Sequence, residues 1–192
     1  MALAANEIRL ENVRLAFPKL WTAEPFPGGN DPTPYFSAMF ILGKDHPQCK
    51  ALEAMMTRIA NEKWAARGPA VLKAAKAMGK VFFRDGDSKA EYDGFEGNMF
   101  VSARSKTRPT ILDGLRQTTT EADGIVYGGC FVNAIISCFA YTKGNNGLGA
   151  GLKGVQYRGK GDAFSGGGIP ADADDFDEIG TADDSESDPL TA

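Results

Sequence analysis

One short stretch, residues 100–108 (FVSARSKTR), has side chains whose types and spacing suit contact with a polyanion. In an extended strand alternate side chains point the same way. One face would therefore hold an aromatic ring, a hydroxyl and two cations: Phe100, Ser102, Arg104 and Lys106. A ring can stack on a nucleic-acid base for about 1–3 kcal/mol, and cations can contact phosphates. With Arg108 just beyond, the stretch predicts a single-strand-binding face, although a solvated strand face can have the same composition.

Other aromatic residues stand beside basic ones near the ends of predicted strands. These pairs are Lys19 with Trp21, Tyr141 with Lys143, and Tyr157 with Arg158. Each pair alone is more often a rim aromatic beside a solvated cation. Their joint occurrence favours a nucleic-acid-binding surface.

A glycine-rich stretch, residues 147–154 (GLGAGLKG), invites comparison with a phosphate-binding loop. It lacks the GxxxxGK[ST] spacing, and no amphipathic helix follows it. We expect instead a flexible loop that lets a DNA backbone approach closely, with Lys153 supplying a positive charge.

The charge of the chain is divided unevenly along its length. The formal net charge is −4, from 21 Lys and Arg against 25 Asp and Glu. Ten of the 25 acidic residues and none of the 21 basic ones follow Gly161, so residues 1–161 carry 21 against 15, or +6. A basic body with an acidic tail is typical of proteins that bind nucleic acids.

The sequence argues against a metal or cofactor site and against an enzyme. It has one histidine, His46, and three cysteines, Cys49, Cys130 and Cys138, with no CxxC or HxxxH pair. The unpaired count indicates reduced thiols in a cytoplasm. Five acidic residues in a predicted turn resemble a calcium loop only loosely, and we interpret them as a solvated hairpin loop: Asp85, Asp87, Glu91, Asp93 and Glu96.

The periodicity of apolar residues predicts short strands interrupted by helices. The expected strands cover residues 7–17 with a bulge near Asn12, then 35–42, 81–84, 98–106, 125–142 and 150–158, with a proline-rich loop over 18–34. Helical spacing runs from Pro47 to Trp64, and a second helix is expected over 70–78. The chain should be mainly β: a small mixed or antiparallel barrel in residues 1–161, a helical insertion at about 45–78, and a disordered acidic tail over 162–192.

Several blocks of the chain resemble the single-stranded DNA-binding proteins of tailed phages and prophages. They are NVRLAFPKLW (residues 12–21), VSARSKTRPTILD (101–113), GGCFVNAIISCFAYTKGNNGLGAGLKGVQYRG (128–159) and the tail segment DADDFDEIG. The resemblance implies an OB-fold barrel that coats single-stranded DNA in phage replication, recombination or repair. It also implies that the tail gates DNA binding and contacts replication or recombination proteins. Within the tail we assign this role to Asp174, Asp175, Phe176, Asp177, Glu178 and Ile179.

Two other functions stay open on the sequence alone: a β-rich structural or assembly protein with a solubilising tail, and a metal-dependent nuclease that uses the acidic turn. The strand with Ile135, Ile136 and Phe139 could equally form a homodimer interface.

No apolar run approaches the ~20 residues needed to cross a membrane, and the N-terminus lacks the pattern of a signal peptide. We therefore expect a cytoplasmic protein of the bacterial host.

Overall fold

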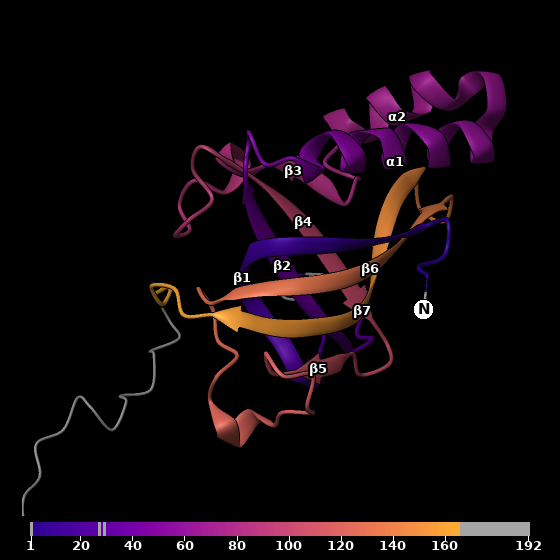
Figure 1. Ribbon diagram of the computed structural model, residues 1–192. Coiled ribbons are helices and arrows are strands. Elements are labelled where there is room, and N and C mark those ends of the chain that lie inside the picture. The colour runs from indigo at the N-terminus through magenta and orange to yellow at the C-terminus, as the bar shows by residue number, and fades with distance from the viewer. Residues whose placement is uncertain (1, 27, 29, 166–192) are drawn as a thin grey trace, which may run out of the picture.

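The structure is a computed structural model that describes residues 2–26, 28 and 30–165 (Figure 1). The strands and helices of this part of the chain follow in the order β1 (Glu7–Glu24), β2 (Tyr35–Gly43), α1 (Gln48–Trp64), α2 (Gly68–Ala77), β3 (Phe83–Asp85), β4 (Asn98–Ser105), β5 (Thr110–Leu112), β6 (Phe131–Tyr141) and β7 (Gly147–Gly159). Three 3-10 turns lie at Ala65–Arg67, Gly86–Lys89 and Glu121–Asp123. The predicted alternation of strands around one helical insertion is confirmed.

Five of the strands close into a barrel. β1 pairs antiparallel with β2 and β6, β2 pairs with β4, and β6 pairs with β7. A parallel contact between β4 and β7, at Arg104 and Gly151, completes the ring. The order β1-β2-β4-β7-β6 is that of the OB fold, a five-stranded Greek-key barrel, and confirms the predicted fold class. β3 extends the sheet beside β4, and β5 lies beside β7.

β1 is longer than the sequence predicts. It contains the expected bulge, where the register shifts between Leu10 and Val13, and Asn12 has a positive φ of 54°. The prediction of a loop from residue 18 is wrong, because β1 continues through Pro18 to Glu24. A second register shift, between Ala16 and Lys19, lets the strand pass the proline. A bulge tolerates a residue that cannot donate a ladder hydrogen bond.

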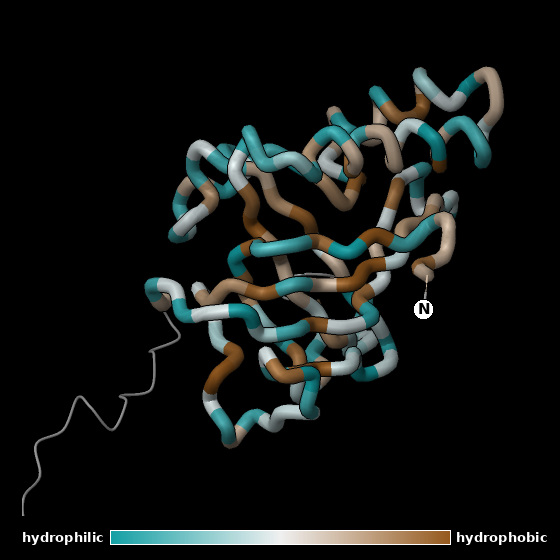
Figure 2. The backbone as a smooth tube through the Cα atoms, viewed as in Figure 1, coloured by the Kyte–Doolittle hydropathy of each residue, from teal (hydrophilic) through white to brown (hydrophobic). Residues whose placement is uncertain are grey.

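Alternating strand residues fill the barrel. Figure 2 shows hydrophobic and hydrophilic positions following each other along the barrel strands. Inward-facing side chains from all five strands are almost completely buried, among them Leu15, Phe40, Val101, Ile136 and Leu152. This core holds the outer strand faces in fixed positions, which is what a surface site requires.

The two helices form a layer over one end of the barrel (Figure 1), where α1 contacts β6 and both helices contact β7. α1 begins one residue after Pro47, and the amide of Gln48 donates to His46 Nδ1 (3.2 Å), so the single histidine serves the helix start. α2 begins at Gly68, two residues before the predicted start at 70, and Pro69 lies in its first turn, which suits proline. α2 ends at Ala77, and Gly79, two residues beyond it, has a φ of +67°.

The long predicted strand over 125–142 is shorter in the structure, because β6 begins at Phe131. Gly129 lies outside it with φ +111°, and a Cβ there would lie 2.1 Å from the Asp162 carbonyl oxygen. Residues 162–165 therefore lie against the barrel. Residues 166–192, which include the proposed docking segment 174–179, lie outside the described residues. No helix in the described ranges has the length and apolarity to span a membrane.

Candidate nucleic-acid interface

β4 has the two faces that the sequence predicts. Val101 and Ala103 enter the barrel core, whereas Arg104 on the opposite face is exposed. β2 pairs alongside with Ser37 opposite Arg104 and Phe36 opposite Ser105. In OB folds this pair of strands, the second and third of the barrel, forms the face that contacts oligonucleotides.

Three cations on this side lie against aromatic rings of β2. The guanidinium carbon of Arg104 is 4.6 Å from the ring centroid of Tyr35, and Lys106 Nζ is 5.9 Å from the same centroid. Arg108 lies 5.8 Å from the ring centroid of Phe36. We call these five residues the basic face. A ring beneath a cation attracts it electrostatically and leaves its outer side available to a further partner.

The charges of the basic face are not neutralised by ion pairs. Within the described ranges, neither Arg104, Lys106 nor Arg108 has a carboxylate oxygen within ion-pair distance. Asp31, in the loop between β1 and β2, lies close enough to interact electrostatically with Arg104 and Lys106. Hydrogen bonds from the Thr33 side chain and backbone, helped by those two cations, lower the pKa of Asp31.

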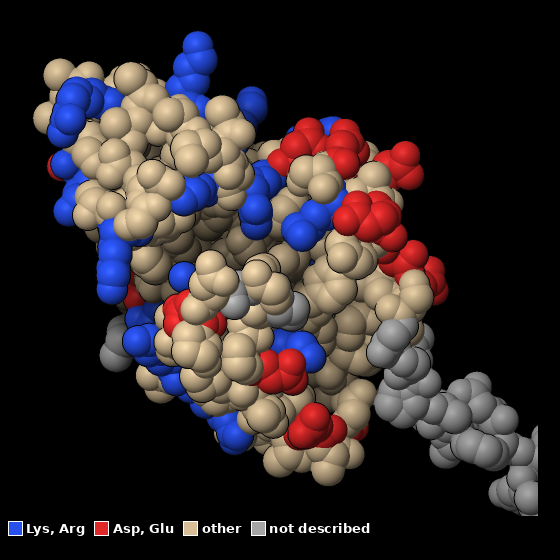
Figure 3. Space-filling view, turned by 180° about the vertical axis from the view of Figure 1, so that it is seen from behind, with Lys and Arg blue, Asp and Glu red and all other residues tan. Residues whose placement is uncertain are grey.

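The molecule is hollowed on this side. Figure 3 views it from behind, the side on which β2 and β4 lie in Figure 1, and shows Lys and Arg side chains around a hollow beneath the helical layer. Asp and Glu gather on a projection at the edge of the view, and a few more lie on the surface below the hollow. The hollow is therefore bordered by several Lys and Arg side chains.

The prediction that Phe100 contacts DNA is wrong. It lies on the outer face of β4, as predicted, but its side chain is 0% exposed. The ring of Phe95 packs edge-on against it at 5.2 Å, and Arg84 lies 4.8 Å from its centroid. A ring covered in this way has no open face on which a base could stack. Tyr35 and Phe36, predicted only as part of the strand over 35–42, lie partly exposed on β2.

Lys19 and Trp21 lie near the end of β1. Lys19 Nζ forms an ion pair with Glu24 (2.9 Å), which partly neutralises its charge. The Trp21 side chain packs partly against the barrel core, and its carbonyl oxygen accepts a hydrogen bond from Arg108 Nη2 (2.7 Å). Trp21 is therefore joined to the basic face through Arg108.

Tyr141 ends β6, and Lys143 is exposed in the turn that connects β6 to β7. In OB folds, oligonucleotides also contact the loop between the fourth and fifth barrel strands, and this turn is that loop. Within the described ranges Lys143 forms no ion pair. These two predicted residues therefore lie at one rim of the region that β2 and β4 provide.

The three predicted residues of β7 lie on the strand that pairs with β4 at Arg104 and Gly151. Lys153 forms an ion pair with Glu7 of β1, and Tyr157 packs partly against the core, where burial raises its pKa. Arg158 is exposed near the end of the strand. Lys153 lies two residues beyond Gly151, the β7 residue that pairs with Arg104, but its charge is taken up by Glu7. Tyr157 and Arg158 lie farther along β7, six and seven residues beyond that contact.

The glycine-rich stretch over 147–154 is not a loop but the first part of β7, which corrects the sequence prediction. Its glycines make room for side chains of β6. A Cβ at Gly147 would lie 2.4 Å from the Tyr141 ring, and one at Gly149 would lie 2.7 Å from the ring of Phe139. Close packing between two strands explains these glycines.

The acidic turn is engaged in internal contacts. Lys44 Nζ lies 3.1 Å from carboxylate oxygens of both Asp85 and Asp87, and Asp93 accepts hydrogen bonds from Ser165. In the part of the chain that the structure describes, no three His, Cys, Asp or Glu side chains gather as a metal site.

Burial raises the pKa of the Cys138 thiol to about 12, which leaves it a poor nucleophile at neutral pH.

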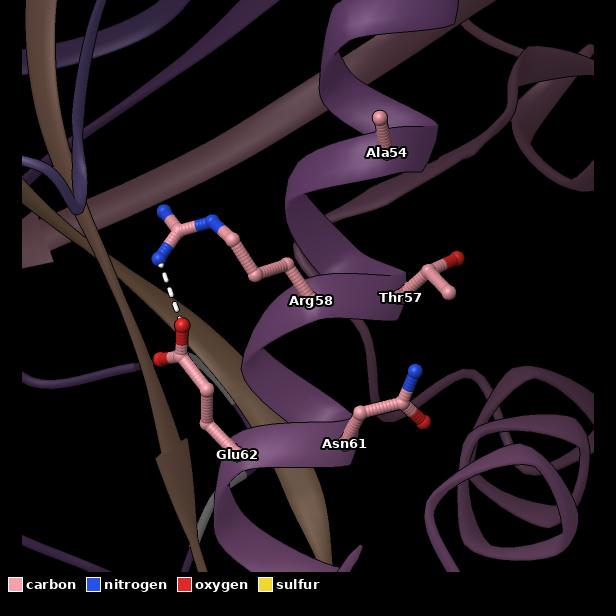
Figure 4. Close-up of a pocket in the computed structure, with 5 residues that line it drawn as sticks. All are labelled: Ala54, Thr57, Arg58, Asn61 and Glu62. Atoms are coloured by element: carbon pink, nitrogen blue, oxygen red, sulfur yellow. Dashed lines mark hydrogen bonds and ion pairs between the residues drawn. The ribbon is translucent and has the colours of Figure 1, made fainter.

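A surface depression of about 650 Å³ lies on α1. Its lining comes from one helix face: Ala54, Thr57, Arg58, Asn61 and Glu62. In Figure 4 Arg58 and Glu62 point toward one another, and they form an ion pair of 2.8 Å. A recess formed by a single helix, with its one cation already paired, offers no converging groups for a ligand.

Comparisons with known proteins find a matching family and similar folds. Residues 6–188 match the family described as "Enterobacter phage Enc34, ssDNA-binding protein". The p50 protein of Acyrthosiphon pisum secondary endosymbiont phage 1 is 36% identical over 183 residues, which are 94% of this chain and 97% of that protein.

Solved structures are also similar. The single-stranded DNA-binding protein of bacteriophage Enc34 superposes with a TM-score of 0.67 at 25% identity, over 83% of this chain and 84% of that one. The same Enc34 protein in complex with ssDNA gives a TM-score of 0.67 at 23% identity, over 83% and 89% of the two chains. The gp2.5 protein of bacteriophage T7 shares the fold at 14% identity, with a TM-score of 0.53 over 91% and 97%.

Proposed function

The chain belongs to the family of phage single-stranded DNA-binding proteins represented by that of Enterobacter phage Enc34, and we propose that it binds single-stranded DNA on its basic face. One observation carries the proposal. Arg104, Lys106 and Arg108 lie on the oligonucleotide-binding side of an OB barrel, over aromatic rings, with no ion pair to a described carboxylate.

The chemistry of this face suits binding without sequence preference. The cations contact backbone phosphates, and the counterions that DNA releases make the affinity fall as salt rises. The rings of Tyr35 and Phe36 offer flat surfaces to bases, and every base has a π-face. Arg104 can remain on Tyr35 while its outward N–H groups donate to a phosphate. Binding of this kind needs no catalytic group.

The acidic tail gates this face in our proposal. Arg14 Nη2 donates to the Asp162 carbonyl oxygen (2.7 Å), and the Arg14 guanidinium lies 4.3 Å from the Phe164 ring centroid. The backbone N–H and hydroxyl of Ser165 then donate to Asp93. We call residues 161–165 the strap. Because the strap is anchored on the barrel, the acidic residues that follow are tethered at high effective concentration and compete with DNA phosphates for the basic face.

A deletion of residues 166–192 tests the gate while keeping the strap. We expect the truncated protein to bind an oligo-dT strand roughly tenfold more tightly at low salt, with the difference disappearing as salt screens both anions. A full-length control, with every Asp and Glu of 166–192 changed to Asn or Gln, separates charge from chain length. Equal affinity of all three proteins at low salt would contradict the gate.

For the phage, we propose that the protein coats single-stranded DNA during replication, recombination or repair in the host cytoplasm. The segment at residues 174–179 is the proposed contact for replication or recombination proteins. An oligo-dT titration followed by Trp21 fluorescence separates this function from a structural role, since a structural protein would give no salt-dependent quenching. Incubation of a labelled strand with Mg²⁺ separates it from a nuclease, and we expect the strand to remain intact.

A further inference from the structure

Arg84 is held in a fixed position beside β4. It lies on β3 opposite Phe100, and its guanidinium is 4.8 Å from the centroid of that ring. Nη2 donates to the Ser102 hydroxyl oxygen and Nη1 donates to the Gly79 carbonyl oxygen, each at 3.2 Å. The side chain thus joins the outer face of β4 to the end of α2.

The charge of Arg84 has no counterion in the described part of the chain. None of the described carboxylates forms an ion pair with it. Its Nε atom is buried without a hydrogen-bond partner, and burial lowers the pKa of the side chain. Arginine stays charged in proteins, and a desolvated charge without a counterion destabilises a fold. Such a group calls for a partner from outside the chain.

Two further cations lie where α2 and the β6–β7 turn meet. Lys80 Nζ contacts the Gly144 carbonyl oxygen at 3.5 Å, and the Leu148 amide donates to the Lys80 carbonyl oxygen at 2.9 Å. Lys143 is exposed in the same turn. Neither lysine is ion-paired within the described ranges. Tyr141, the last residue of β6, leads into this turn.

These contacts continue the basic face toward the helical layer. Ser102 and Arg104 are successive outer positions of β4, and alternate residues of a strand lie about 7 Å apart. Arg84 reaches Ser102 from the neighbouring strand. We propose that Arg84, with Lys80 and Lys143, forms a second phosphate-binding subsite for the DNA strand, which runs along β4 from the basic face to the β6–β7 turn.

This inference rests on the proposed DNA binding and is tested by salt-dependent affinity for an oligo-dT of about 16 nucleotides, the upper site size of an OB fold. Arg84→Gln should bind about tenfold more weakly at low salt, and the slope of log affinity against log salt should fall by about 0.7, one phosphate contact. Arg84→Lys keeps the charge and should keep most of the slope. Arg9→Gln removes an exposed, carboxylate-paired cation from β1 and should leave the slope unchanged.

Thermal unfolding distinguishes an effect of the substitution on DNA binding from an effect on the stability of the fold. Arg84→Gln relieves a desolvated charge, so its unfolding temperature should equal or exceed that of the wild type, whereas a purely structural arginine would lower it. If this variant fails to fold, Lys143→Gln tests the same subsite from an exposed position, with the same expected loss of about 0.7 in slope. Absence of oligo-dT binding by the wild type would contradict the proposed function itself. Wild-type binding with unchanged slopes for both variants would overturn only the second subsite.

Discussion

Cations on two parts of the surface are satisfied in different ways. On β1 and on the helices, Arg9 lies 2.7 Å from Glu11, and Lys76 lies 2.7 Å from Glu53. On the basic face, Arg104 and Lys106 lie over the ring of Tyr35 and have no carboxylate partner in the described ranges. An ion pair cancels charge, whereas a ring orients a cation and leaves its charge available.

The difference shows why the number of basic residues is a poor guide to a polyanion site. Lys153 and Arg104 look equivalent in the sequence, yet Lys153 is paired with Glu7 across the barrel. Exposed pairs of this kind contribute little to stability. They do lower the positive potential of the surface that carries them. The surface that keeps its potential is the one where rings replace carboxylates.

The largest effect should come from removing both cations that lie on Tyr35. We expect Arg104→Gln with Lys106→Gln to weaken oligo-dT binding about 30-fold at low salt and to lower the salt slope by about 1.4. The matched control is Arg9→Gln with Lys76→Gln, which removes the same charges from carboxylate-paired positions. Equal losses in the two double variants would show that total charge, not its arrangement, determines binding.

A smaller effect should follow from removing the ring while keeping both cations. Tyr35→Ala takes away a stacking surface worth about 1–3 kcal/mol and should weaken binding about tenfold, with little change in salt slope. Tyr35→Phe keeps the ring and should bind like the wild type. A loss in the phenylalanine variant as large as in the alanine variant would assign the effect to the hydroxyl and contradict stacking.

The smallest expected effect is an increase in affinity for DNA. Asp31→Asn removes the negative charge that acts on Arg104 and Lys106, so binding should tighten about two- to threefold at low salt. Because the folded-state pKa of Asp31 is lowered, its carboxylate is already ionised above about pH 5, and the gain should be the same at about pH 6 and about pH 8. A gain that varies across this range, or weaker binding, would show that Asp31 does not oppose DNA.

The local sequence pattern predicted most of the strands and helices. It did not predict contacts between segments that lie far apart in the sequence. The apolar alternation located the barrel strands, and Pro47 marked the start of α1 to within one residue. The cover over Phe100 was not predictable, because Phe95 reaches it through a turn whose path depends on the packed barrel. The pairing of Lys153 with Glu7 joins residues 146 positions apart. The basic charges were visible in the sequence, but their partners were not.

Photo-crosslinking tests most directly where the strand lies. An oligo-dT strand with 5-iodouracil at each position in turn is irradiated with the full-length protein, and adducts are located by peptide mass spectrometry. We expect adducts on Tyr35 or Phe36 of β2, and we expect them to be lost when both residues are changed to alanine. Adducts confined to Tyr157 or Phe139, on the β6–β7 side of the barrel, would contradict it.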